Sequence, residues 1–334
     1  MTPAEHAFAR YVRILGKGKS GSRSLSREEA HSAFSMILED RVEPLQLGAF
    51  LMLLRVKEET PDELAGFVSA CRDTMNTQPT ESPIDLDWPS YAGKKTQQPW
   101  YLLSALLLAA NGVRILMHGS DGHTAGRVYS EACLNQLGIK AADNLAQALQ
   151  NIDAVNFAYL PLRNFCLPLH NIIQLKHLLG LRSPVNTLVR LLNPVLAPYS
   201  VQSVFHPAYA DLHARADQLL GQPHSLVFKG EGGEVEIKPH ANTRCTLLRQ
   251  GTLQQLDWPR CLDTKPAPQT DLSAQALLAL WRGERDDSYG TLAVLQTTAS
   301  ILLLLQRAAN IDQAGRLAQR WWRQRDRSSL PSCL

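Results

Sequence analysis

Segment 91–119 constrains the fold most, because it holds a loop, an apolar helix and a short strand in the order of a β-loop-α-β unit. The helix pattern is Leu102–Ala110, closed by Asn111-Gly112, and the strand pattern is Val113–Met117. An apolar run that ends in Asn-Gly and leads into a β-branched run is typical of such a unit. Phosphate usually binds at the loop before the helix, because free backbone N–H groups and the helix dipole face the anion there.

The loop itself reads Tyr91-Ala92-Gly93-Lys94-Lys95. Glycine lets a backbone approach phosphate closely, and this loop contains one glycine followed by two lysines. The sequence therefore predicts a loop that is electropositive but poorly shaped to cradle a pyrophosphate.

The rest of the chain separates into a helical part and an alternating part. Residues 3–76 have helical periodicity, and the proline-containing stretch Thr77–Pro89 is interpreted as a linker. Helix and strand patterns then alternate, with further strands expected at 201–205, 225–228 and Glu234–Ile237, and a long helix at Thr291–Arg323. These patterns predict a small N-terminal α-helical domain hinged to a larger α/β domain with a central sheet. The expected domains are residues 1–80 with part of 160–190, and residues 81–334.

Composition favours a compact protein inside the cell. The 334 residues are 45% apolar and 19% charged, which excludes wholesale disorder. The six cysteines have no C-x-x-C spacing and are interpreted as reduced thiols, not as a zinc site. Leu102–Ala110 and Ile301–Leu305 are too short to cross a bilayer. We therefore expect a cytoplasmic protein with no membrane partner.

Several motifs resemble those of anthranilate phosphoribosyltransferases and the related pyrimidine nucleoside phosphorylases, which share a glycosyltransferase family 3 fold. They are Leu25–Ala30, Gln46–Arg55, Glu58–Gly66, and Arg182 to Asn186 followed by Asn193-Pro194. The resemblance covers nearly the whole chain. It implies the phosphoribosyltransferase-type fold and a homodimer formed through the N-terminal helices.

The chain departs from the family pattern at the residues that bind the donor substrate and magnesium. The family's donor loop is Gly-Thr-Gly-Gly-Asp, where this chain has Tyr91–Lys95. Its Lys-His-Gly-Asn-Arg block becomes Met117–Asp121, and only Glu236 remains of the acidic pair that holds magnesium. The resemblance leaves a vestigial donor and acceptor cleft at Gly93, Ser104, His118, Gly119, Arg182 and Asn186. No cofactor is expected.

Net charge is only +3, but the cations are clustered. Residues 1–27 carry six Lys/Arg against Glu5, and residues 316–327 carry five arginines against Asp326. Either cluster alone is more often a solvated surface, yet phosphate contacts suffice for nonspecific nucleic-acid binding. A family subgroup with similarly altered loops is thought to bind nucleic acid. The residues expected to contact single-stranded or duplex nucleic acid are Lys17, Lys19, Lys94, Lys95, Arg182, Arg190, Arg320, Arg323 and Arg325.

Two functions follow from these patterns. The first is a nonenzymatic, weakly sequence-specific nucleic-acid-binding homodimer. The second is a transferase or phosphorylase with an altered donor or acceptor, using Lys94, Lys95 and Arg182 for phosphate and Glu236 for magnesium. The lost Gly-Gly-Asp and the substitution at Met117 favour the first.

Overall fold

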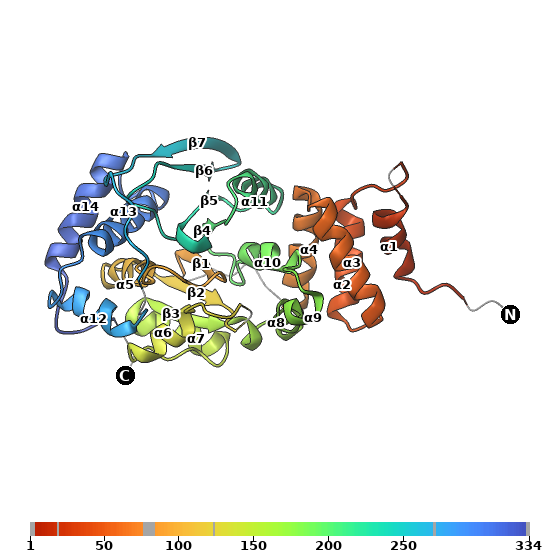
Figure 1. Cartoon of the computed structure of the whole chain (residues 1–334), viewed down its shortest axis with the longest axis horizontal. Coiled ribbons are helices and arrows are strands. Elements are labelled where there is room, and N and C mark those ends of the chain that lie inside the picture. Colours follow the sequence, from red (N-terminus) through yellow and green to blue (C-terminus); the bar gives the residue numbers. More distant parts are fainter. Residues whose placement is uncertain (1–3, 19, 76–83, 123, 270–271, 332–334) are drawn as a thin grey trace.

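A computed structural model describes residues 4–18, 20–75, 84–122, 124–269 and 272–331. Figure 1 shows a helical domain at one end of an elongated molecule and an α/β domain, with helix α14, at the other. None of the helices in these ranges is both long and apolar enough to cross a membrane. The sequence prediction of a small helical domain joined to a larger α/β domain is confirmed.

The helical domain begins with α1 (Ala9–Gly16), α2 (Arg27–Leu38), α3 (Pro44–Lys57) and α4 (Pro61–Thr74). Capping boxes fix the starts of α2 and α4, where Ser26 pairs with Glu29 and Thr60 with Glu63. Gly66 lets α2 and α4 approach closely, since a Cβ there would lie 2.4 Å from the carbonyl oxygen of Arg27.

Later helices return to the same apolar core. After the short turn η1 (Leu162–Asn164) come α8 (Leu167–Gln174), α9 (Lys176–Leu179), α10 (Val185–Leu188) and η2 (Val189–Leu191). Buried side chains of α8 and α10 join those of α2–α4 in one cluster. The predicted domain boundary near residue 80 falls outside the described residues.

The α/β domain is built on a seven-stranded sheet in the order β3-β2-β1-β4-β5-β6-β7. Strands β1 to β5 are parallel, and β6 and β7 add an antiparallel hairpin. The strands are β1 (Leu86–Ser90), β2 (Ile115–Gly119), β3 (Phe157–Pro161), β4 (Tyr199–Ser203), β5 (His224–Phe228), β6 (Thr243–Arg249) and β7 (Thr252–Trp258).

Helices cover both faces of this sheet. Side chains from α5, α6 and α12–α14 share one core with the sheet, while α7 and α11 pack in two smaller clusters. The helices are α5 (Tyr101–Ala110), α6 (Ser130–Gln136), α7 (Leu145–Val155), α11 (Ala208–Leu219), α12 (Ala274–Arg282), α13 (Ser288–Leu304) and α14 (Ile311–Gln324), with the turn η3 (Glu231–Gly233).

Three predicted elements were wrong. The linker at Thr77–Pro89 contains most of β1; Pro89 is tolerated because the β4 pairing ends at Asp87. Glu234–Ile237 forms no strand, because it folds back toward the loop after β1 and carries two buried carboxylates there. The helix at Thr291–Arg323 breaks between α13 and α14, where Asn310 caps α14.

Candidate functional site

The loop after β1 is held by an internal carboxylate. Glu234 accepts hydrogen bonds from the backbone N–H groups of Ala92 and Gly93, both at 2.6 Å, and from the Ser90 hydroxyl at 2.8 Å. Gly93 adopts φ +67°, a conformation that glycine takes without strain. The N–H groups available for a phosphate at this loop are therefore bonded to the protein's own side chain.

A second carboxylate occupies the start of the following helix. Glu236 accepts the backbone N–H of Tyr101, the first residue of α5, at 3.0 Å. Its other oxygen lies 2.6 Å from the Lys94 ammonium, and both side chains are buried. Burial raises the pKa of Glu236, and the Lys94 charge opposes that rise. An internal ion pair thus stands where the dipole of α5 would face an anion.

These contacts correct two site predictions. Lys94 is 1% exposed, so in this structure its ammonium does not reach a nucleic-acid backbone. Glu236 is engaged by Lys94 and Tyr101, and within the described residues no group of three or more His, Cys, Asp or Glu could hold a metal ion. The side chains present do not fit a magnesium site. Lys95, in contrast, is exposed.

Three of the vestigial cleft residues, His118, Gly119 and Ser104, are structural. His118 is fully buried, 2.7 Å from the Tyr91 hydroxyl and 3.1 Å from Asp87. Gly119 faces the Ser90 carbonyl, which would lie 2.2 Å from a Cβ. The buried hydroxyl of Ser104 donates to the carbonyl of Val294 and is not available to a phosphate.

Three cations gather near Thr124, and none has a carboxylate within 4 Å in the part of the chain that the structure describes. Thr124 Oγ1 accepts from Lys176 at 3.1 Å and from Arg182 at 3.4 Å, while Arg127 donates to the carbonyls of Ala92, Gly93 and Gly232. Desolvation and the charges of Arg182 and Arg127 lower the pKa of Lys176. Burial and the charge of Arg127 likewise lower the pKa of Arg182. We call Arg127, Lys176 and Arg182 the cleft cations.

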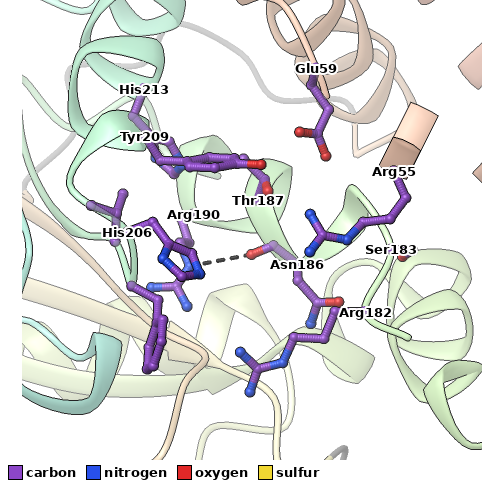
Figure 2. Close-up of a pocket in the computed structure, with 12 residues that line it drawn as sticks. Arg55, Glu59, Arg182, Ser183, Asn186, Thr187, Arg190, His206, Tyr209 and His213 are labelled. Carbon is purple, nitrogen blue, oxygen red and sulfur yellow. Dashed lines mark hydrogen bonds between the residues drawn. The ribbon is translucent and has the colours of Figure 1, made fainter. Parts of the chain in front are cut away.

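A cavity of about 130 Å³ lies beside them, between the α3–α4 turn, α10 and the start of α11. Figure 2 shows Arg55 and Glu59 extending into it from the helical domain, and Arg182 and Asn186 lining it from the other side. We call this cavity the hinge pocket. Its Arg190 is 8% exposed and donates to the carbonyls of Asn186, Ser203 and Gly233, so its predicted contact with nucleic acid is not supported by its position.

Two of the six cations in the N-terminal basic cluster are paired with carboxylates. Arg13 pairs with Glu5, and Arg23 pairs with Glu29 at 2.6 Å. Lys17 is exposed, and Lys19 lies outside the described residues. This cluster and α14 lie at opposite ends of the molecule in Figure 1, so one protomer does not bring them together.

The arginines of the C-terminal cluster on α14 are exposed and not engaged in ion pairs among the described residues. Arg316, Arg320 and Arg323 are exposed and recur at i, i+4 and i+7 on α14, which places them on one helix face. Within the described residues, no carboxylate lies within 4 Å of them. We call these three residues the arginine stripe.

Arg325 does not join that stripe. It stacks 3.6 Å from the centre of the Trp322 ring and donates to the Trp281 carbonyl at 2.8 Å. Burial lowers its pKa to about 10. Its predicted nucleic-acid contact is replaced by a role in fixing the end of α14.

Sequence reasoning missed Glu234, Arg127, Lys176 and Glu59. The sequence pattern places Glu234 in an expected strand, and its burial beside the loop after β1 is visible only in the structure. The remaining three come from separate segments, and only the fold brings them near Arg182.

The chain matches two family models, described as a glycosyl transferase family helical bundle domain (residues 11–75) and a glycosyl transferase family a/b domain (residues 101–323). The chain therefore belongs to glycosyl transferase family 3. It is 30% identical over 250 residues to the Escherichia coli K12 protein YbiB, described as uncharacterized, covering 73% of this chain and 77% of YbiB.

Enzymes of the family are also similar. An anthranilate phosphoribosyltransferase of Methylocella silvestris is 29% identical over 314 residues, 91% of this chain and 88% of the relative. The solved anthranilate phosphoribosyltransferase of Thermus thermophilus matches with a TM-score of 0.78 at 24% identity, covering 95% of this chain and 94% of that one. That similarity establishes the shared fold.

Proposed function

We propose that this protein binds nucleic acid through phosphates, with weak sequence preference, on an anthranilate phosphoribosyltransferase-like scaffold that no longer transfers phosphoribosyl groups. The observation that carries the proposal is the arginine stripe of Arg316, Arg320 and Arg323, exposed and without carboxylate partners among the described residues. The loop after β1 supports the loss of phosphoribosyl transfer. Its Ala92 and Gly93 N–H groups are bonded to Glu234, and its Lys94 is bonded to Glu236.

The stripe has the dimensions of a backbone contact. Seven residues of helix separate Arg316 from Arg323, roughly 10 Å at 1.5 Å per residue. A stacked strand presents about three phosphates over that length. Guanidinium groups bind phosphate through paired N–H donors and are always charged, so each arginine can displace one counterion.

The test is the salt dependence of affinity for a fluorescein-labelled single strand, measured by anisotropy. Log affinity should fall linearly with log salt, and Arg316→Ala/Arg320→Ala/Arg323→Ala should make the slope shallower by about 2, at roughly 0.7 per phosphate. The matched control Arg41→Ala/Arg244→Ala/Arg260→Ala removes three exposed arginines that pair with carboxylates. Equal effects of both triple variants, or a flat salt response, would contradict the proposal.

We also propose that the protein is a homodimer joined through the N-terminal helices. Leu45 and Val56 of α3 are 89% and 82% exposed and offer two apolar side chains to such a contact. Leu45→Arg/Val56→Arg should convert a dimer to a monomer in light scattering coupled to gel filtration. An unchanged mass, or a monomeric wild type, would refute this interface.

A second function is transfer with an altered donor, and the cleft cations favour it. Arg127, Lys176 and Arg182 form a positive group that a phosphorylated substrate could neutralise. Magnesium belongs only to this alternative, and the engagement of Glu234 and Glu236 argues against it. Turnover of phosphoribosyl pyrophosphate that is lost in Arg182→Ala would support the alternative. Absence of turnover with phosphoribosyl pyrophosphate would refute this alternative.

A further inference from the structure

The hinge pocket contains buried polar atoms that no described protein group satisfies. Glu59 Oε2, Ser183 Oγ and Asn186 Oδ1 have no hydrogen-bond partner among the residues that the structure describes, and Glu59 is only 6% exposed. Buried polar atoms are nearly always bonded, so three orphans lining one cavity indicate a missing partner that carries donors. The carboxylate of Glu59 points into the cavity from the helical domain (Figure 2).

The cations of the same pocket call for hydrogen-bond acceptors on the occupant. Arg55 and Arg182 line it, and neither has a carboxylate within 4 Å among the described residues. Arg55 bonds to Tyr209 and Arg182 donates to Thr124 Oγ1 at 3.4 Å, and each guanidinium keeps further N–H donors that an acceptor on the occupant can take. The occupant therefore carries both hydrogen-bond donors and hydrogen-bond acceptors.

Aromatic side chains define the shape of that occupant. Tyr209 lines the pocket with His206, and Phe205 beside it is 47% exposed, packed edge-on against His206 at 5.1 Å. An exposed aromatic ring beside positively charged side chains is the arrangement on which nucleobases stack. The cavity of about 130 Å³ has room for several waters, and therefore for a flat ring system.

We propose that the hinge pocket binds one unpaired guanine base. Guanine alone among the standard bases presents two adjacent donors, N1–H and the N2 amine, that a carboxylate such as Glu59 can accept together. Its O6 and N7 are the acceptor pair that arginine binds in bidentate fashion, which suits Arg55 or Arg182.

This inference rests on the proposed function, because the guanine belongs to a nucleic-acid strand that the protein has bound. In a duplex the N1–H and N2 edge is used in pairing, so the pocket selects a single strand. The cleft cations share Arg182 with the pocket and can hold the phosphate of the same nucleotide. The protein would then bind phosphates with little sequence preference and recognise a single base in the hinge pocket.

Anisotropy with labelled 12-nucleotide strands tests this. Three strands are compared: all thymidine, thymidine with one central guanine, and thymidine with one central hypoxanthine, which lacks the N2 amine. One guanine should tighten binding about tenfold, the size of one bidentate contact, and hypoxanthine should lose most of that gain. Glu59→Gln should abolish the difference between the guanine and thymidine strands. The exposed neighbour variant Glu58→Gln should keep it.

Each failure has a separate meaning. Equal affinity for the three strands would overturn the base pocket and leave phosphate binding intact. No binding of any strand at low salt would overturn the proposed function and this inference with it. Displacement of the strand by an equal concentration of free guanosine would assign the pocket to a nucleoside and refute the strand as its source.

Discussion

Removing Lys94 should destabilise the fold and not the complex with nucleic acid. The Lys94 ammonium lies 2.6 Å from Glu236 Oε1, with side-chain exposures of 1% and 0%. In Lys94→Met the Glu236 carboxylate keeps only the N–H of Tyr101 at 3.0 Å. An uncompensated buried charge of this kind costs about 3–5 kcal/mol, a large part of a typical unfolding free energy of about 5–15 kcal/mol.

The sign of its pH dependence follows from burial. Burial raises the pKa of Glu236 even beside Lys94, so without the cation the carboxyl can become neutral by taking up a proton. The loss should therefore be larger at pH 8 than at pH 5. The neutral pair Lys94→Gln/Glu236→Gln should recover most of the stability, because neither partner is left charged.

Urea unfolding followed by circular dichroism measures these differences. With a slope near 3 kcal/mol/M, the midpoint of Lys94→Met should fall by about 1 M or more. Its folded form should keep the wild-type salt slope for single strands. A midpoint within experimental error of wild type, with a shallower salt slope, would show that Lys94 is an exposed phosphate contact and would refute the buried pair.

Three other changes have defined outcomes. Burial raises the pKa of Glu59 to about 7. The buried carboxylate therefore lowers the unfolding free energy by about 3 kcal/mol at pH 8 and has no such effect near pH 4, where the carboxyl is protonated. In urea titrations, Glu59→Gln should be more stable than wild type at pH 8 and show little difference at pH 4. Arg325→Ala should lose about 1–3 kcal/mol with an unchanged salt slope, whereas Arg323→Ala should flatten the slope. Gly66→Ala should separate α2 from α4 and lower the melting temperature, at about 1–3 kcal/mol; unchanged melting would contradict that packing.

The fold could be predicted because its signals are local. The capping boxes of α2 and α4 and the apolar run of α5 are readable within a few residues. Strand β1 was hidden because Asp87 and Pro89 are unfavourable strand residues, and the Asp87 carboxylate is bonded to Ser200 and His118 from neighbouring strands. Such compensation is visible only after the sheet has formed.

The site was harder to predict for the same reason. Lys94 and Glu236 are separated by 142 positions, so the sequence shows a lysine in a loop and an acid elsewhere, without their contact. The prediction that the donor loop is poorly shaped for pyrophosphate is consistent with its bonds to Glu234. Arg320 and Arg323 are exposed as their sequence pattern suggested, while Arg325 is held against Trp322, a contact that a count of charges does not reveal.

The most direct test of the account is a pair of calorimetric titrations of one wild-type preparation. One uses phosphoribosyl pyrophosphate with magnesium, and the other a 12-nucleotide single strand, both at low salt. Because Glu234 and the Lys94–Glu236 pair fill the donor loop, we expect no binding heat with the first and saturable heat with the second. Magnesium-dependent binding of phosphoribosyl pyrophosphate, with no heat from the strand, would contradict the central claim.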